Sequence, residues 1–171
     1  MKVLILNPGS ESLRFAVIAA APPRGDLVRG REVLSGMIEP IGGAARFSVQ
    51  KAAGRILREE KVPVKDHAEA ASQLFARMHW TPAHFDLMAL RMMQVGTCIT
   101  SLCESTIRSS RALKRWDLAA LHHASSVTVF LAFQTALRGS VPGVAIFDSG
   151  FTRLFGLSRR PTPFQTSWPE A

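Results

Sequence analysis

The chain has 171 residues, of which 47% are hydrophobic, and its 21 Lys and Arg outnumber 13 Asp and Glu to give a net charge of +8. This length and apolar content predict one well-cored globular domain and exclude a disordered chain. No apolar run reaches the roughly 18 to 20 residues that cross a bilayer, and the start lacks the features of a signal peptide. Two cysteines are too few for a disulfide scaffold. We therefore expect a cytoplasmic protein without a membrane partner.

The basic residues are scattered along the chain rather than gathered in one block. Clustered Lys and Arg would indicate a nucleic-acid surface, because they gain affinity for phosphates through counterion release. The group with helical spacing is Arg108, Arg111, Lys114 and Arg115, and no interleaved aromatic residues or nucleic-acid motif accompany it. This pattern favours a solvated helix face and predicts no nucleic-acid partner.

The first elements in chain order are strands. The apolar run 2–7 ends at Pro-Gly, and the second run, 13–20, follows the turn Pro-Gly-Ser-Glu-Ser, so that the two form a hairpin. Residues 31–41 and 45–50 are two further strands separated by Gly42 and Gly43. These runs predict an antiparallel meander at the start of the domain.

From Asp66 the pattern becomes helical. Residues 66–78 carry apolar or small residues at helical spacing, with Asp66 as N-cap and Glu69 three positions later in a variant of the capping box. Residues 85–93 are apolar nearly throughout, which predicts a central strand covered on both faces.

The second half alternates helices and a strand. It predicts a helix over 105–114, a buried helix over 124–137 that Gly139 ends, and a sixth strand over 143–148. This order is typical of the mixed α/β class, with a central sheet flanked by helices. The tail is rich in proline and without periodicity, so we expect it to be extended or poorly ordered.

Polar groups follow three of the predicted strands or turns. They are residues 7–14, Arg91 and Asp148, and ligands of open α/β sheets bind beyond strand ends. A turn of small residues offers backbone N–H groups and hydroxyls to a phosphate, and an Arg adds a forked set of donors. A carboxylate at a strand end holds a metal or orients a nucleophile. The set suits phosphoryl transfer, although a plain hairpin turn and a strand-capping Asp also fit these residues.

Five segments in chain order resemble the acetate kinases and the related propionate and butyrate kinases of the actin-like ATPase superfamily. They are NPGSESLRF at 7–15, GMIEPIG at 36–42, DHAEA at 66–70, ALHHA at 120–124 and VAIFDSGF at 144–151. The family patterns are N-x-G-S-S-S-L-K-F, G-L-x-E-R-I-G, D-H-x-x-A, A-P-L-H-N-P and V-x-V-F-D-T-A-F-H. The resemblance implies a ribonuclease H-like fold whose mixed sheet begins with antiparallel strands and is flanked by helices.

The resemblance also implies a role for each matched polar residue. Asn7 would help to bind Mg²⁺, and Arg91 and His122 would bind the substrate carboxylate. Asp148 would be the catalytic carboxylate. Ser10, Ser12 and Arg14 would bind the nucleotide phosphates, with Arg14 in place of the usual Lys. Such cations and a metal would neutralise the negative charge that phosphoryl transfer spreads over the equatorial oxygens.

The chain also departs from the family pattern. The segment ALRMMQVG keeps Arg91 but has Leu90, Gln94 and Val95 where the family has histidines and the first of two glycines, which predicts a reshaped substrate loop. Thr152 stands in place of the histidine of F-D-T-A-F-H. We expect a kinase-like lobe over 1–152 and a tail over 153–171, with the nucleotide-binding C-terminal lobe of the family absent.

The activity that the resemblance implies is the conversion of ATP and a short-chain carboxylate, such as acetate, to ADP and an acyl phosphate. Because catalysis by positioning needs both reactants held in a closed site, we expect the chain by itself to be inactive. The alternative is a noncatalytic remnant or interaction module that pairs with a separate C-terminal lobe. A homodimer is the other partner expected.

Overall fold

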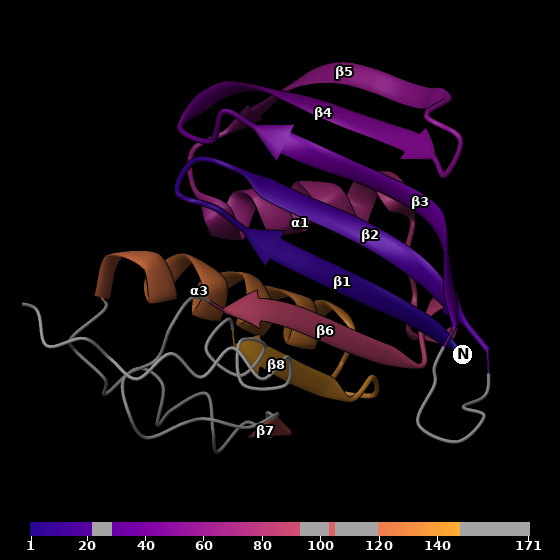
Figure 1. Ribbon diagram of the computed structural model, residues 1–171. Coiled ribbons are helices and arrows are strands. Elements are labelled where there is room, and N and C mark those ends of the chain that lie inside the picture. Colours follow the sequence, from indigo (N-terminus) through magenta and orange to yellow (C-terminus); the bar gives the residue numbers. More distant parts are fainter. Residues whose placement is uncertain (22–28, 93–102, 105–119, 148–171) are drawn as a thin grey trace, which may run out of the picture.

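The computed structural model describes residues 1–21, 29–92, 103–104 and 120–147, which form a single mixed sheet covered by helices (Figure 1). The strands are β1 (Lys2–Pro8), β2 (Leu13–Ala20), β3 (Gly30–Glu39), β4 (Gly43–Lys51), β5 (Ile56–Val64), β6 (Leu87–Met92), β7 (Cys103–Glu104) and β8 (Gly143–Phe147). The helices are α1 (His67–Met78), the short 3-10 helix η1 (Pro82–His84) and α3 (Ala120–Ala136). The order of the strands across the sheet is β5-β4-β3-β2-β1-β6-β8-β7.

The predicted hairpin at the start of the chain is confirmed. Strands β1 and β2 pair antiparallel from Lys2↔Ala19 to Pro8↔Leu13. Alternate side chains of both strands, among them Leu6 and Phe15, are buried on one face. The alternation of apolar residues in β2 therefore fixes the register of the hairpin, because a slip of one residue would turn these side chains to the other face.

The antiparallel meander is also confirmed, and it is one strand longer than predicted. Strands β3 and β4 follow as expected, and β5 pairs antiparallel with β4 at the sheet edge. The sequence prediction missed β5, since its central residues are charged and only Val62 and Val64 at its end are buried. Pro63 is tolerated in this strand because an edge strand leaves one side of its backbone unpaired.

Beyond β1 the next two strands are parallel, and the two-residue β7 then pairs antiparallel with β8. Strand β6 pairs parallel with β1, and β8 pairs parallel with β6, so the carboxyl ends of these three neighbouring strands lie at one edge of the sheet. Helix α3 leads into β8 through a short connection and therefore runs back along it, so the first turn of α3 is at this same edge (Figure 1). This arrangement confirms the predicted mixed α/β class.

Helix α1 begins where its cap was predicted. Asp66 has extended backbone angles, and its Oδ1 accepts a hydrogen bond from the Glu69 N–H at 2.8 Å. The Glu69 carboxylate in turn accepts from the Lys65 N–H at 2.9 Å, one residue before the cap. The helix ends at His79, whose left-handed backbone (φ 49°) turns the chain away.

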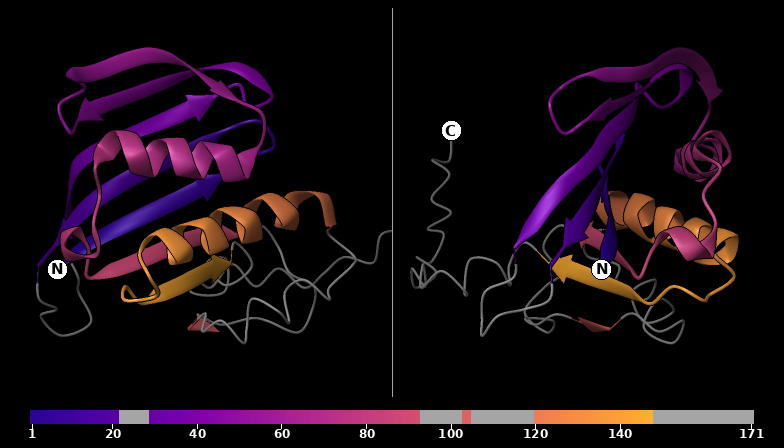
Figure 2. Two further views of the ribbon diagram at one scale, coloured as in Figure 1. Left: turned by 180° about the vertical axis from the view of Figure 1, so that it is seen from behind. Right: turned by 90° about the vertical axis from the view of Figure 1, so that its right-hand side faces the viewer.

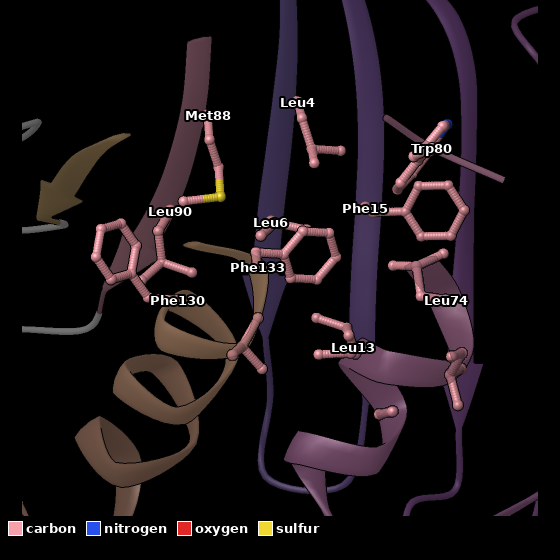
Figure 3. Packing of buried hydrophobic residues seen from close by; sticks show 14 of the residues in the cluster. Leu4, Leu6, Leu13, Phe15, Leu74, Trp80, Met88, Leu90, Phe130 and Phe133 are labelled. Atoms are coloured by element: carbon pink, nitrogen blue, oxygen red, sulfur yellow. The ribbon is translucent and has the colours of Figure 1, made fainter. Parts of the chain in front are cut away.

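The two α-helices, α1 and α3, cover the same face of the sheet (Figure 2). The core lies between them and the strands, where Leu4 and Leu6 of β1 and Phe133 of α3 are buried together (Figure 3). Aromatic rings extend this core. Phe75 of α1 packs edge to face against Phe133 with 6.2 Å between the ring centroids, and Trp80 packs edge to face against Phe15 with 5.5 Å between theirs. We call this the helix face of the sheet and the opposite side its open face.

Several predicted elements differ from the structure or lie outside it. Helix α3 begins at Ala120, four residues before the predicted start, and ends before Gly139 as expected. Strand β6 is buried on the helix face, but the prediction that it is covered on both faces is wrong at Arg91, which is exposed. The predicted helix over 105–114 and the tail over 153–171 lie outside the described residues.

Candidate functional site

The turn between β1 and β2, residues 9–12, is closed by a hydrogen bond from the Gly9 N–H to the Ser12 carbonyl at 2.7 Å. Among the described residues, the N–H groups of Ser10, Glu11 and Ser12 donate no hydrogen bond. A Cβ on Gly9 would lie 2.7 Å from Ser12 Oγ, so glycine leaves room for the hydroxyl. Successive free N–H groups in a turn form a concave anion-binding surface.

Two other motifs of the sequence hold this turn in place. The Ile41 N–H donates to the Glu11 carbonyl at 2.9 Å, from the loop that joins β3 and β4. His67, at the start of α1, has its Nε2 2.8 Å from the Gly9 carbonyl oxygen. The segments 36–42 and 66–70 therefore contact the segment 7–15 directly. This contact gives a physical reason why the three sequence motifs occur together in the chain.

A shallow pocket of about 380 Å³ opens beside the turn. Its lining residues are Ser10, Glu11, Ser12, Glu39, Pro40 and Arg46. Ser10 and Ser12 were predicted from the sequence as phosphate-facing residues, and they do share a pocket. Arg14, predicted beside them, does not line it; the arginine that does is Arg46 of β4, which the sequence analysis did not single out.

Charged side chains of alternating sign run from strand to strand across the open face. Arg14 Nη2 lies 4.0 Å from Glu39 Oε2, and Arg46 Nη2 lies 3.8 Å from Glu39 Oε1. Arg46 Nη1 lies 3.7 Å from Glu59 Oε1 on the outermost strand. The four residues sit on β2, β3, β4 and β5 in turn, and the row ends at Arg14, directly opposite Asn7 in the hairpin register.

Asn7 and Arg91 lie near each other at the carboxyl ends of adjacent parallel strands. Leu6 of β1 aligns with Leu90 of β6, and both leucines are buried on the helix face. Asn7 and Arg91 are the next residues of their strands and therefore belong to the open face. Asn7 is half-buried, and its side chain makes no hydrogen bond with any residue that the structure describes. Arg91 is exposed and aligns with Ile146 of β8.

The two remaining predicted residues, His122 and Asp148, are adjacent in sequence to or part of described elements, but neither side chain is described. His122 belongs to the first turn of α3, and its side chain lies outside the described structure. Asp148 directly follows Phe147, the last residue of β8, and also lies outside the described residues. The structure thus brings Asn7, the 9–12 turn, Arg91 and the start of α3 to one edge of the sheet, and their joint action with Asp148 as a single site stays a prediction.

Over the described residues, no group of three or more His, Cys, Asp or Glu side chains lies close enough to hold a metal ion. The donors at the edge are instead the Asn7 amide and the hydroxyls of Ser10 and Ser12. Mg²⁺ keeps several waters and shares its coordination with substrate phosphates, so a sparse set of oxygen donors fits Mg²⁺ that arrives with a nucleotide. In the described part of the chain, no helix is long and apolar enough to span a membrane.

Comparison with known proteins identifies the family of the chain. The family model described as the acetokinase family matches residues 2–159. The chain belongs to the acetokinase family. The acetate kinase of Solibacter usitatus is 29% identical over 164 residues, which cover 88% of this chain and 39% of that protein. The propionate kinase of Citrobacter koseri is also 29% identical, over 157 residues, covering 88% of this chain and 36% of that protein.

Solved structures of acetokinases share the fold. The acetate kinase of Porphyromonas gingivalis superposes with a TM-score of 0.72 at 20% identity, covering 89% of this chain and 38% of that one. The propionate kinase of Francisella tularensis gives 0.69 at 19% identity, with the same two coverages. The predicted actin-like fold is therefore confirmed. The chain spans less than two-fifths of the length of these relatives.

Proposed function

We propose that this chain works in phosphoryl transfer between ATP and a short-chain carboxylate, such as acetate, propionate or butyrate, which yields ADP and an acyl phosphate. Membership of a carboxylate kinase family is the starting point. The observation that carries the proposal is the meeting of Asn7 and Arg91 at adjacent strand ends, beside a turn with three N–H groups to offer. Amide, guanidinium and N–H donors at one edge suit a reaction between two anions.

In this proposal the 9–12 turn faces the phosphates. Ser10 and Ser12 supply hydroxyls, and Arg14 supplies a cation that becomes available when it leaves Glu39. Asn7 would hold Mg²⁺ through its amide oxygen, and the metal would neutralise the charge on the transferred group. Charge neutralisation and positioning account for most of the catalysis in phosphoryl transfer, because the chemistry itself asks little of the protein.

The carboxylate would bind on the other side of Asn7. Arg91 can present two parallel N–H donors to a carboxylate, a geometry that fixes its orientation. His122 would approach from the first turn of α3. Asp148 would be the catalytic group, positioning or activating the carboxylate oxygen that attacks the phosphorus. The position of Asp148 one residue after β8 supports this role, since β8 ends at the edge that Asn7 and Arg91 share.

The 171 residues supply one side of this site. Relatives of more than twice the length suggest a second lobe that binds the nucleotide and closes over it, and reactants need to be held about 3 to 3.5 Å apart for efficient transfer. We therefore propose that the isolated chain has little or no turnover and that it acts in the cytoplasm together with a C-terminal lobe, with a second copy as a further partner.

A hydroxamate assay for acyl phosphate tests the kinase activity. The chain is supplied with ATP, Mg²⁺ and acetate, propionate or butyrate in separate reactions. Any turnover should disappear in Asp148→Asn and persist in Asp86→Asn, which alters an aspartate just before the amino end of β6. Robust turnover by the pure chain would refute the proposed dependence on a second lobe, and turnover that survives Asp148→Asn would refute the role of Asp148.

Binding of acetyl phosphate tests the site without requiring turnover. In an NMR titration of the isolated chain, Arg91→Gln should raise the Kd about tenfold, as expected for the loss of a charge-assisted pair. Arg31→Gln, at the far end of β3, removes the same charge and should leave the Kd unchanged. An absence of both binding and turnover would favour the noncatalytic alternative, for which the altered segment after Arg91 is the motivating observation.

A further inference from the structure

Arg46 occupies a position that no motif in the sequence signals. It lies in the middle of β4, directly opposite Glu39 of β3, and its side chain lines the pocket that Ser10 and Ser12 share. It is about half exposed, so its guanidinium reaches solvent at the mouth of that pocket. A cation is therefore present beside the free N–H groups of the turn.

The Glu39 carboxylate of this pocket lies near two arginines, Arg46 in the lining and Arg14 outside it. Glu39 is 4.0 Å from Arg14 and 3.8 Å from Arg46, distances at which oppositely charged groups attract but do not form hydrogen bonds. The guanidinium donors of both arginines thus remain available to a closer acceptor. The pocket lining also includes Glu11, and Arg46 also faces Glu59, so the two arginines and these three carboxylates carry a combined charge of −1. Affinity for an anion therefore rests on the directed N–H donors of the guanidinium groups and of the turn, not on an excess of positive charge.

The contacts of Glu39 are weak enough to be displaced. Ion pairs between exposed side chains stabilise by about 0 to 1 kcal/mol, whereas a phosphate that accepts two parallel N–H bonds from an arginine gains more. A phosphate in the pocket would also accept from the N–H groups of residues 10–12 and from the hydroxyls of Ser10 and Ser12. Glu39 would then act as an internal competitor that occupies the arginines until phosphate arrives.

We propose that Arg46 is a second arginine for the phosphate chain of the nucleotide, and that Glu39 competes with that chain for Arg46 and Arg14. The ligand chemistry is a linear di- or triphosphate, free or attached to a nucleoside. The inference rests on the proposed function in assigning the 9–12 turn to phosphate, and it adds a phosphate-binding residue and a competing carboxylate to the site.

Calorimetric titration of the full chain with tripolyphosphate tests the inference. Arg46→Gln should raise the Kd about three- to tenfold, the effect of losing one charge-assisted contact at a half-exposed side chain. The matched control is Arg31→Gln, which removes an equal charge eight residues from Glu39 along β3, roughly 26 Å away at the rise of a strand. An equal effect of the two variants would overturn the proposal, because it would mean that tripolyphosphate senses only the net charge.

Glu39→Gln should change the Kd for tripolyphosphate in the direction opposite to Arg46→Gln. Removal of the competing carboxylate should lower the Kd for tripolyphosphate, and the combination Glu39→Gln with Arg46→Gln should lose most of this gain. Glu59→Gln, which removes a carboxylate of equal charge outside the pocket, should have a smaller effect than Glu39→Gln. Unchanged or weaker binding in Glu39→Gln would contradict the competition.

Two further titrations identify the ligand and separate this inference from the proposed function. ATP should compete with tripolyphosphate and adenosine should not; competition by adenosine would argue against a phosphate site. If wild-type chain fails to bind tripolyphosphate, the assignment of Arg46 is wrong, while carboxylate binding through Arg91 is still decided by the acetyl phosphate titration. If Arg46→Gln weakens tripolyphosphate binding but no variant affects acetyl phosphate binding, the phosphate pocket is supported and the proposed kinase function is not.

Discussion

The imidazole Nε2 of His67 lies 2.8 Å from the carbonyl oxygen of Gly9, and this contact links the first residue of α1 to the turn between β1 and β2. The two residues are 58 positions apart in sequence. The side chain of His67 is partly buried, so the hydrogen bond is shielded from water on one side. It fixes the turn from the helix side, while Ile41 fixes it from the β3–β4 loop.

His67→Ala should loosen the turn. The loss of one partly buried hydrogen bond is expected to lower the free energy of unfolding by about 1 kcal/mol. Amide hydrogen exchange should accelerate at Gly9, whose N–H closes the turn. His84→Ala, which removes a histidine of η1 that contacts Thr81, is the control and should leave exchange at Gly9 unchanged. Equal exchange at Gly9 in wild type and His67→Ala would show that the contact does not hold the turn.

Gly36→Ala should be strongly destabilising, because a Cβ at this position would lie 2.2 Å from the Ser48 carbonyl oxygen and 2.6 Å from the Phe15 ring. Forcing backbone and ring apart in a packed sheet is expected to cost about 3 kcal/mol or more. In Gly43→Ala the added Cβ meets nothing within 4 Å, so the change should be within about 0.5 kcal/mol. Urea unfolding of both variants measures the difference, and similar midpoints would refute the packing argument.

Asp66→Ala removes the acceptor for the Glu69 N–H at the start of α1. We expect a loss of about 1 kcal/mol in the free energy of unfolding, the usual effect of deleting an N-cap. Asp66→Ser keeps a capping oxygen and should recover most of it. Thermal unfolding followed by circular dichroism would compare the three proteins; a Ser variant as unstable as the Ala variant would rule out capping as the reason.

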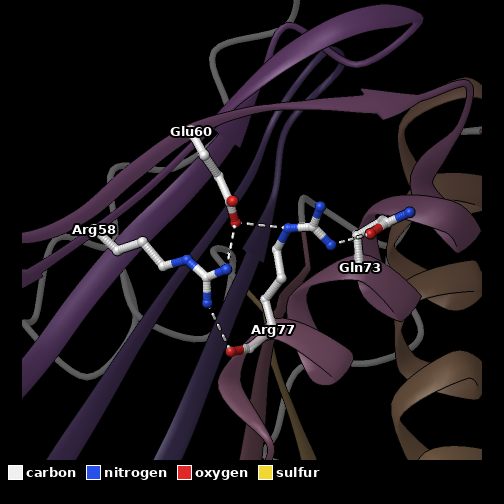
Figure 4. A network of polar contacts seen from close by, with 4 residues as sticks. All are labelled: Arg58, Glu60, Gln73 and Arg77. Atoms are coloured by element: carbon white, nitrogen blue, oxygen red, sulfur yellow. Dashed lines mark hydrogen bonds and ion pairs between the residues drawn. The ribbon is translucent and has the colours of Figure 1, made fainter.

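Glu59 and Glu60 are neighbours on β5 that face opposite sides of the sheet, and they should differ sharply in their contribution to stability. On the helix face, Glu60 Oε1 lies 2.8 Å from Arg77 Nε and 3.0 Å from Arg58 Nη2 (Figure 4). Arg77 also contacts Gln73, and Arg58 donates to the Arg77 carbonyl at 3.2 Å. Both Glu60 Oε1 and Arg77 Nε are shielded from solvent. This network joins the sheet edge to the end of α1.

Glu60→Gln should therefore lower the free energy of unfolding by about 1 to 3 kcal/mol, since it leaves shielded guanidinium donors without their carboxylate. Glu59→Gln breaks an exposed pair with Arg46 and should cost less than about 1 kcal/mol. Chemical denaturation in low and high salt would compare them. If Glu59→Gln proves as destabilising as Glu60→Gln, the network in Figure 4 does not carry the stability assigned to it.

Most of the fold could be predicted, because most of its helices and strands have a recognisable pattern in their own local sequence. The hairpin has alternating apolar residues around a Pro-Gly turn, α1 has a capping aspartate, and β6 has an apolar run. Strand β5 could not be predicted in this way, because an edge strand buries few side chains and Glu60 is stabilised by arginines that come partly from a helix later in the chain. The short β7 offers two residues, too few for any periodicity.

For the candidate site, too, the features with a local sequence signal could be predicted, and those that depend on tertiary packing could not. The polar residues at the ends of β1 and β6 were predicted to meet, because carboxyl ends of parallel strands share an edge. Arg46 carried no signal, since a single arginine at an outward position of a strand is typical of an ordinary surface. His67 stands in the segment DHAEA, yet its contact with Gly9 depends on the packing of α1 against the sheet, which no local pattern encodes.

The described supports of the 9–12 turn come from residues 1–67. Strand β6 pairs with β1 only across a long stretch of chain, as Val3↔Leu87 shows, and β8 then pairs with β6. Parallel pairing of distant strands is slow, because the loop between them must close first. During synthesis the hairpin, the β3–β4 loop and the start of α1 leave the ribosome well before Arg91 does. The 9–12 turn would thus be assembled first, and the edge that carries Arg91 would be added to a turn already in shape.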